Sequence, residues 1–340
     1  MIPPQVRTME SRKVQITGGS TYIVSLPKSW VKERGIKAGD PLWVTNLQDG
    51  ALLLNHKLKA EKVTKKKIMQ IDDESEKHLI RKMIGIYLAG YNTIEIRSKK
   101  IEPKMRRAIS DFTKMVVGPE IIDEDSKCVV LQDLINPAEF SQKKGLRRMY
   151  MLVKSMHKDA ITALKKREKN LAKDIILRDG EVDRLHWMIA KQYNLILNDA
   201  EIAKSIGVSS EKSLNLMLIS RIIERIGDHA TKIAEGILLL NGMDIEDNIL
   251  KEIASESDIS LEILDKSMNA FFSEDLNEAN EAIDLREKLG RVSDVLMKKI
   301  RDQESDVVVS LASIIESVRR TGLYATDISE IAINYIFSLR

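Results

Sequence analysis

The sequence has one cysteine, few aromatic residues and no long apolar run. Cys128 alone among 340 residues excludes an internal disulfide and is typical of a reducing compartment. No stretch approaches the roughly 20 apolar residues of a membrane-spanning helix, and the first residues lack the apolar core of a signal peptide. We therefore expect a cytoplasmic protein without membrane insertion. A Gly-rich phosphate loop, a cysteine cluster and a Ser-His-Asp arrangement are also missing from the sequence, which argues against several enzyme classes.

Proline is absent from the whole second part of the chain. All seven prolines lie at or before Pro137, so the sequence divides into a mixed front part and an all-helical back part. Charge is also unevenly distributed. Residues 1–70 hold 13 Lys and Arg against 5 Asp and Glu, whereas the rest holds 41 against 46. The basic N-terminal part, here called the head, precedes an acidic remainder, called the body. This division indicates that the head binds an anionic partner.

The first fifty residues predict short strands with tight turns. Strands are expected at 12–16, 21–25, 41–45 and 51–54, with a helix at 28–34 that Gly35 would end. A unit this small cannot bury a core alone, so we expect a homodimer through it.

The order of these elements, with Leu26-Pro27 and Gly35-Ile-Lys-Ala-Gly-Asp40, resembles the AbrB/SpoVT family over residues 8–57. The resemblance implies an intertwined dimer whose swapped hairpins form a DNA-binding surface. It makes the basic residues of the first hairpin and the short helix candidates for phosphate contacts: Arg12, Lys13, Lys28, Lys32 and Arg34. The turn Thr17-Gly-Gly-Ser20 departs from the family's Ser-Lys-Gly, which removes one basic residue. The alternative is a head that only dimerises.

Residues 66–137 predict a small α/β domain. Strands are expected at 68–71, 93–97 and 128–131, and helices at 74–88 and 103–116. No residues in it have catalytic spacing, and the sequence does not indicate its role.

The remaining chain predicts six helices in two similar halves. They are expected at 140–168, 170–200, 211–241, 247–273, 275–303 and 306–338. Ala163 and Ala172 recur 107 residues later, and Gly227, Ala230, Thr231, Ile233 and Glu235 recur 95 residues later. The fold class is therefore mainly α, with two tandem three-helix bundles at 140–242 and 247–339 behind a small β domain and an α/β domain.

Two acidic pairs stand out in the first bundle. Asp179 and Asp183 are four residues apart, as are Glu224 and Asp228, so each pair lies on one side of its helix. Two such helices could jointly hold an oxygen-ligated metal, to which Asp159 and Asp174 could contribute. The alternative is that each pair is an ordinary solvated face.

The segment Glu224-Arg-Ile-Gly-Asp-His-Ala-Thr-Lys-Ile-Ala-Glu235 closely resembles the signature of PhoU proteins, the regulators of phosphate uptake, and Leu177-Arg-Asp-Gly-Glu-Val-Asp-Arg-Leu185 resembles their second motif. The resemblance implies paired three-helix bundles whose acidic motifs bind multinuclear metal clusters, with Mg, Mn, Fe or Zn as candidate ions. In the second bundle the equivalent positions are Arg286, Gly290, Arg319 and Leu323. We therefore expect metal only in the first bundle.

Three functions compete at this point. The first is a non-enzymatic regulator of phosphate uptake that binds DNA through its head and senses or signals through its body. The second is a dimeric adaptor that contacts a phosphate ABC transporter or its signalling protein without binding DNA. The third, a carboxylate-bridged metalloenzyme, is disfavoured because none of the five histidines makes a Glu-x-x-His pair with these acids.

Overall fold

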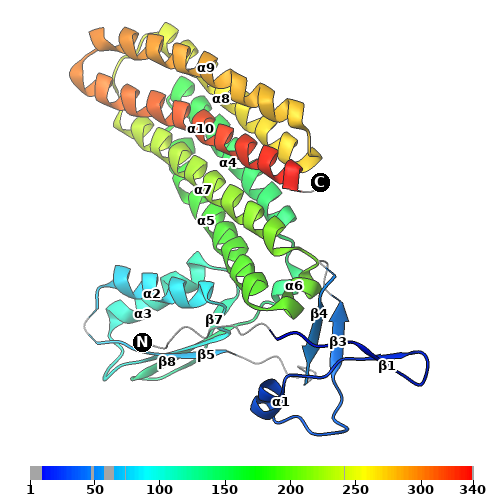
Figure 1. Ribbon diagram of the computed structural model, residues 1–340. Coiled ribbons are helices and arrows are strands. Elements are labelled where there is room, and N and C mark those ends of the chain that lie inside the picture. Colours follow the sequence, from blue (N-terminus) through cyan, green and yellow to red (C-terminus); the bar gives the residue numbers. More distant parts are fainter. Residues whose placement is uncertain (1–9, 47–49, 57–64, 73, 241, 339–340) are drawn as a thin grey trace. The chain divides into compact units, whose positions relative to one another are not determined.

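The computed structural model describes residues 10–46, 50–56, 65–72, 74–240 and 242–338, and the chain divides into two compact units, Met1–Val63 and Thr64–Arg340 (Figure 1). Each unit is described by itself below. The outermost residues of the expected head (8, 9 and 57), the last residue of the third expected helix (241) and the end of the second bundle (339) lie outside the described residues.

The N-terminal unit holds two hairpins with a short helix between them: β1 (Gln15–Thr17), β2 (Thr21–Ile23), α1 (Lys28–Arg34), β3 (Trp43–Asn46) and β4 (Leu52–Asn55). β1 pairs with β2 and β3 with β4, both antiparallel. Gly18 and Gly19 turn the first hairpin at φ values of 63° and 83°, a conformation that favours glycine. Gly35, at φ 67°, ends α1 as expected. The first strand starts later than predicted, at Gln15.

None of the described residues in this unit is buried. Tyr22 and Leu52 are 72% and 64% exposed, and Val14, Ile16 and Val44 are similarly open to solvent. Apolar side chains on both hairpins therefore lack a core within one copy of the unit.

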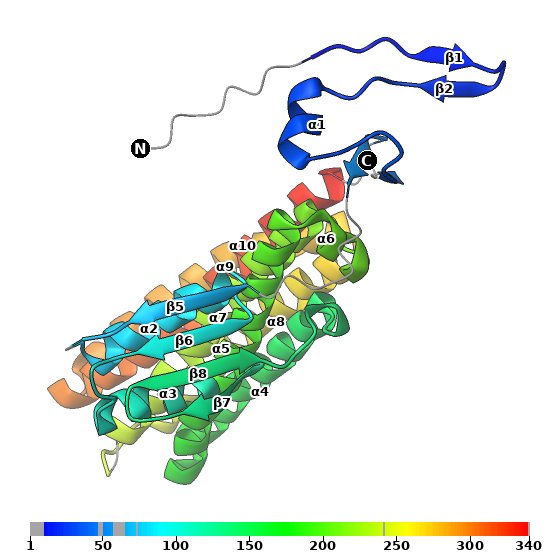
Figure 2. The ribbon, with the colours of Figure 1, turned by 90° about the horizontal axis from the view of Figure 1, so that it is seen from below.

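The second unit begins with a four-stranded sheet in the order β5-β6-β8-β7. Its elements are β5 (Lys66–Gln70), α2 (Glu76–Leu88), β6 (Thr93–Arg97), α3 (Pro103–Met115), β7 (Pro119–Glu124) and β8 (Cys128–Asp133). β5 is parallel to β6, and the other two pairings are antiparallel. The sequence analysis missed β7, one of the two edge strands. Figure 2 shows the sheet with α2 and α3 behind it, on one face only.

The α/β domain contacts the helical part at the C-terminal end of helix α5 (Lys169–Asn198). Lys191 and Asp133 form an ion pair with both side chains only 4% exposed, and the Lys191 ammonium lies 4.3 Å from the centre of the Tyr87 ring. The Asn194 amide donates to the carbonyl of Leu88 at 3.0 Å. Removing one partner of a buried ion pair leaves an uncompensated charge, so loss of either Lys191 or Asp133 would weaken the contact between the domain and α5.

The helical part contains both predicted bundles. The first consists of α4 (Gln142–Lys166), α5 and α7 (Ser210–Leu239), and the second of α8 (Asp247–Ser273), α9 (Leu276–Lys299) and α10 (Ser305–Ser338). Ser141, Ser209 and Asp275 cap the starts of α4, α7 and α9 by accepting hydrogen bonds from backbone N–H groups. The seven-residue helix α6 (Ala200–Ile206), between α5 and α7, was not predicted. A short 3-10 turn, Pro137–Glu139, precedes α4, and another, Ile300–Asp302, precedes α10.

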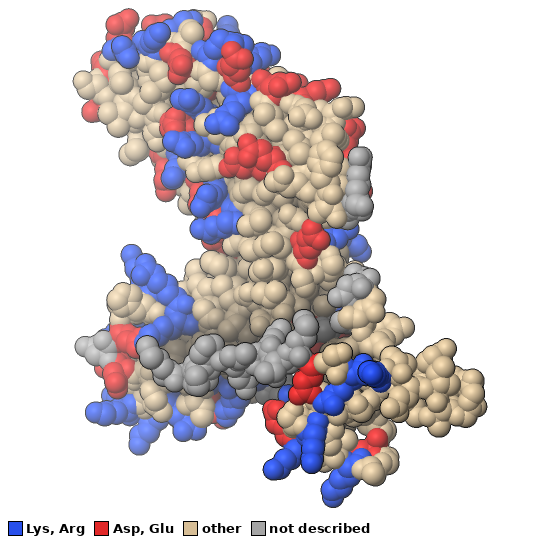
Figure 3. All heavy atoms as spheres, in the orientation of Figure 1, with Lys and Arg blue, Asp and Glu red and all other residues tan. Residues whose placement is uncertain are grey.

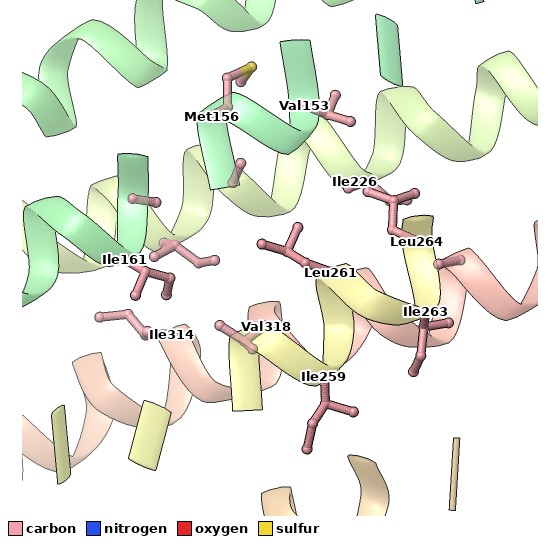
Figure 4. Close-up of a cluster of buried hydrophobic side chains, with 14 of the residues drawn as sticks. Val153, Met156, Ile161, Ile226, Ile259, Leu261, Ile263, Leu264, Ile314 and Val318 are labelled. Atoms are coloured by element: carbon pink, nitrogen blue, oxygen red, sulfur yellow. The ribbon is translucent and has the colours of Figure 1, made fainter. Parts of the chain in front are cut away.

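The two bundles share one apolar core. Figure 4 shows side chains of α4 (Val153, Met156), α8 (Leu261, Leu264) and α10 (Ile314, Val318) in one cluster, and all of these are buried. Burying such side chains contributes about 1.5–3 kcal/mol each, so the halves stabilise one another.

The repeat in the sequence is also a repeat in space. Helices α4 and α8 end at the equivalent residues Arg167 and Glu274, which both adopt the left-handed conformation at φ 56° and 58°. Helices α7 and α10 pack on each other, and the equivalent residues His229 and Tyr324 meet there with ring centres 5.5 Å apart. Helices α4 and α7 thus pack on their own counterparts, α8 and α10, as expected for two halves related by an approximate two-fold axis.

Among the helices of the described segments, none has both the length and the apolar character needed to cross a membrane.

Candidate functional site

The four predicted carboxylates lie between α5 and α7 of the first bundle. Asp179 and Asp183 are on α5, and Glu224 and Asp228 are on α7. Gly227 allows this approach: a Cβ there would lie 3.2 Å from Asp179 Oδ1 and 3.5 Å from a methyl group of Val153. The structure therefore brings the two acidic pairs together.

Burial raises the pKa values of all four groups, and repulsion from neighbouring carboxylates adds to the rise for Asp179, Asp183 and Glu224. Burial, and then the charges of Asp183 and Asp228, raise the pKa of Asp179 to about 7. Burial, and then Asp228, raise the pKa of Glu224 to about 7, although Arg221 opposes the shift. The pKa values of Asp183 and Asp228 are also raised, chiefly by burial. The cluster therefore holds protons at neutral pH more strongly than free carboxylates do.

Two buried oxygens of this cluster lack a hydrogen-bond partner among the described residues. They are Asp179 Oδ1 and Glu224 Oε2. The other Glu224 oxygen accepts a hydrogen bond from Arg221 at 2.8 Å. A buried carboxylate oxygen without a partner is costly, and a cation or a proton would satisfy it. The donor set, four carboxylates on two helices, suits a hard oxygen-seeking cation.

The side chains are not arranged as a finished metal site. Among the described residues, no group of three or more His, Cys, Asp or Glu side chains is placed to hold a metal ion. Asp159 and Asp174, considered as further ligands, instead form ion pairs with Arg178, at 2.7 and 3.0 Å. Metal binding therefore stays a prediction, and it requires that the four carboxylates move together around the ion.

Sequence reasoning missed two neighbours of the cluster. The charge of Glu235 contributes to the raised pKa of Asp179. The positive charge of Arg221 partly opposes the rise in the pKa values of Asp183, Glu224 and Asp228. The helical period could have identified both, because Arg221 precedes Glu224 by three residues and Glu235 follows Asp228 by seven.

The second bundle has a different set of charges at the equivalent place. Arg319, the counterpart of Glu224, lies 3.9 Å from Asp294. Its positive charge also acts on Glu256 of α8, where it opposes the rise in the pKa of that carboxyl group. Glu256 is fully buried, accepts a hydrogen bond from Ser293, and has its pKa raised to about 7, chiefly by burial. Sequence reasoning missed Glu256 because its burial, unlike its i, i+4 spacing with Glu252, depends on packing between helices. One carboxylate beside an arginine is not a ligand set for a metal.

The five predicted DNA-contacting residues lie in the N-terminal unit, and all are exposed. Lys28, Lys32 and Arg34 are on α1, and Arg12 and Lys13 precede β1. Figure 3 shows Lys and Arg side chains gathered on this unit. Arg12 pairs with Glu10. Exposed basic side chains of this kind can neutralise phosphate charge, but in one copy of the unit they do not by themselves specify DNA.

Known proteins resemble both parts of the chain. The PhoU domain family matches residues 146–237 and 253–332, and the bacterial antitoxin family MazE, described as antidote-toxin recognition, matches residues 15–67. The phosphate-specific transport system accessory protein PhoU homolog 1 of Thermotoga maritima is 26% identical over 197 residues, covering 55% of this chain and 82% of that protein. The PhoU homolog of Clostridium acetobutylicum is 26% identical over 200 residues, covering 56% of this chain and 89% of that protein.

A solved structure shows the same fold in the helical part. The crystal structure of PhoU from Pseudomonas aeruginosa superposes with a TM-score of 0.50 at 18% identity, over 58% of this chain and 96% of that chain. The PhoU matches fall on the two bundles and together span just over half of the sequence. The chain therefore belongs to the PhoU family and carries an N-terminal domain similar to MazE and AbrB.

Proposed function

We propose that the chain is a dimeric cytoplasmic regulator of phosphate transport, which binds DNA through its N-terminal unit and a divalent or trivalent cation through its first bundle. The regulatory role is supported by the PhoU domains and by relatives that are accessory proteins of phosphate-specific transport systems. No catalytic step is part of this proposal: regulation works through binding and through coupling between sites.

The observation that carries the proposal is the composition of the N-terminal unit. Its described residues combine exposed apolar side chains on both hairpins with exposed Lys and Arg around α1, and none of them is buried. The apolar side chains require a second copy as cover, and pairing would double the basic surface. A basic dimeric surface is suited to the phosphate backbone of duplex DNA.

The cation site is supported by the two unpartnered buried oxygens and by the clustered carboxylates between α5 and α7. Asp179, Asp183, Glu224 and Asp228 would hold the ion. The cation would replace the protons that Asp179 and Glu224, with pKa values of about 7, otherwise hold near neutral pH.

The second candidate is a dimeric adaptor that contacts a phosphate transporter or its signalling partner and does not bind DNA. It is favoured by one specific observation: the family matched by the N-terminal unit is described as recognising a protein, the toxin.

DNA binding at two salt concentrations separates the two candidates. The probe is the promoter region of the organism's own phosphate-transport genes, with a scrambled duplex beside it. We expect sequence-selective binding that weakens by an order of magnitude or more between about 50 and 200 mM salt. Replacing Arg12 and Lys13 by Ala should abolish it, whereas Lys288→Ala/Lys298→Ala, two exposed lysines of α9, should bind like the wild type. Absence of binding at low salt would reject the DNA-binding function and leave the adaptor.

A further inference from the structure

The second bundle buries an acid where the first bundle buries an apolar side chain. Glu256 of α8 is fully buried, and so is its counterpart 107 residues earlier, Met149 of α4. Because an apolar residue fills the same place in the first bundle, packing does not require an acid there. Burying a carboxyl group without a packing requirement is costly, which indicates that Glu256 has a role of its own.

One hydroxyl group can serve both protonation states of Glu256. The Ser293 hydroxyl of α9 is hydrogen-bonded to Glu256 Oε1 and lies 3.0 Å from the backbone carbonyl of Leu289. When Glu256 is protonated, its O–H can donate to Ser293, whose own hydrogen goes to the carbonyl. When Glu256 is ionised, Ser293 can turn its hydrogen to the carboxylate, because the carbonyl of Leu289 still accepts a backbone N–H of the helix.

The other oxygen of Glu256 favours the protonated form. Glu256 Oε2 is buried and has no hydrogen-bond partner among the described residues. A charged oxygen in this position costs more free energy than the oxygen of a neutral acid. Burial accordingly raises the pKa of Glu256 to about 7, against the opposing effects of the Ser293 hydrogen bond and the charge of Arg319.

A cation lies near Glu256 without pairing with it. Arg319 of α10 has a buried Nε–H group that donates no hydrogen bond to any described residue. Its charge acts on Glu256, but its guanidinium lies 3.9 Å from Asp294 of α9, whose side chain is 70% exposed. An exposed pair at this distance adds little stability, so Arg319 is weakly held in its present position. Glu256 Oε2 and Arg319 Nε are thus an acceptor and a donor that both lack a partner.

We propose that Glu256 is a proton-binding site of the second bundle, at which the proton and the Arg319 guanidinium alternate in neutralising one carboxyl group. In the protonated state Glu256 is neutral and Arg319 lies beside Asp294. When the proton leaves to solvent, Arg319 turns inward and donates its Nε–H to Glu256 Oε2. Helix α10 thereby exchanges a surface contact with α9 for a core contact with α8. The four carboxylates of the first bundle take no part in this exchange.

The other titratable groups around this site leave Arg319 as the cation for an ionised Glu256. Glu316 of α10 adds to the rise in the pKa of Glu256, and Glu252, one turn earlier on α8, is paired with a lysine of α9. His157 of α4 is hydrogen-bonded to the residue after Glu256, and burial lowers its pKa to about 4. This histidine is therefore neutral over the range in which Glu256 titrates.

Infrared spectroscopy of the full-length protein at several pH values tests for the proton. A protonated carboxyl group gives a carbonyl band that a carboxylate lacks. Subtracting the spectra of Glu256→Gln separates the pH-dependent band of Glu256 from those of Asp179 and Glu224. We expect the band to be present about one unit below neutral pH and to disappear with a midpoint at about 7. Its absence at the lower pH would overturn the proton-binding site.

Arg319→Gln tests the exchange itself. Without the cation that receives the ionised carboxylate, the midpoint of the Glu256 band should rise by about one unit, which is tenfold tighter proton binding. The control is Arg291→Gln, which removes an exposed arginine of α9 that pairs with Glu287 on the same helix, and it should leave the midpoint unchanged. An equal midpoint in the wild type and in Arg319→Gln would overturn the exchange.

Urea unfolding gives a second measurement of the exchange. Below the midpoint of Glu256 the proposal gives Arg319 no buried partner, so Arg319→Gln should unfold at nearly the wild-type urea concentration. Above the midpoint the variant should unfold at a lower concentration, because the wild type alone gains the core ion pair. In a Glu256→Gln background this pH-dependent difference should disappear. A variant that fails to fold below the midpoint, or that is equally weakened at every pH, would contradict the proposal.

Discussion

A carboxylate buried beside other carboxylates is unfavourable unless a proton or a cation neutralises it. Asp179 and Glu224 are in this position, with pKa values raised to about 7. In the folded protein they hold protons that the unfolded chain has already released. Their ionisation therefore lowers the free energy of unfolding as pH rises from about 4 to about 7.

Asp179→Asn tests this effect at a single position. At pH 4 the variant and the wild type should be about equally stable, because the protonated acid and the amide are both neutral. By pH 8 the variant should be more stable by about 1 kcal/mol, a value reduced for partial solvent exposure. Urea unfolding at several pH values gives the difference. The buried His157 and His186 and the half-buried His229, whose pKa values are lowered to about 4, contribute equally to both proteins.

The control for this measurement is Asp284→Asn, an exposed carboxylate of α9, which should show no pH-dependent difference from the wild type. Adding Mn²⁺ at pH 8 should stabilise the wild type and leave Asp179→Asn nearly unchanged. A wild-type stability that tracks Asp179→Asn at every pH would show that Asp179 is ionised normally.

At the scale of elements, glycine sets how closely helices approach. A Cβ on Gly322 of α10 would lie 2.4 Å from Leu289 of α9 and 3.3 Å from the Cα of Ser260 on α8. The equivalent Gly227 lies against α5 and α4 in the first bundle. Gly290 of α9, in contrast, has open space around it.

Gly322→Ala and Gly290→Ala should therefore change stability in opposite directions. Alanine in a helix is favoured over glycine by about 1 kcal/mol, but crowding in a packed core costs about 1–3 kcal/mol. We expect Gly322→Ala to destabilise the protein by about 1 kcal/mol and Gly290→Ala to stabilise it by about 0.5–1 kcal/mol. Thermal and urea unfolding of the two variants measures this. Equal effects from both substitutions would show that the crossing at Gly322 is not tight.

The sequence predicted the long helices well because each has a clear apolar period and a clear start signal. Ser141, Ser209 and Asp275 mark three of those starts. It missed β7 because Pro119 opens the strand, a bulge interrupts it near Ile121, and its apolar residues do not alternate. It missed α6, whose seven residues are too few to show a period, although Asp199 and Gly207 mark its ends as Pro27 and Gly35 mark those of the equally short α1.

The candidate site could be predicted only in part, for a related reason. The i, i+4 spacing of Asp179 with Asp183 and of Glu224 with Asp228 depends on one helix at a time and is visible in the sequence. That Arg178 pairs with Asp159 of α4, or that Glu256 is buried beside Ser293, depends on contacts between helices. Such contacts follow from packing, which the sequence pattern does not specify.

At the scale of the whole molecule, helix α5 joins the carboxylate cluster to the α/β domain. Asp183 and Lys191 are two turns apart on this helix, and Lys191 is locked to Asp133 of β8. A shift of α5 on cation binding would reach the sheet directly, and the chain of the N-terminal unit leads into β5 of the same sheet. If the cation site and the DNA surface are coupled in this way, each ligand must change the affinity for the other.

The most direct test of the account measures DNA affinity with and without a saturating cation, Mn²⁺, in the wild type and in Asp179→Asn/Glu224→Gln. We predict that the cation changes wild-type affinity by about fivefold or more and leaves the double variant unchanged, at constant ionic strength. The same affinity for the wild type in both conditions, or an equal change in the double variant, would contradict coupling between the first bundle and the head.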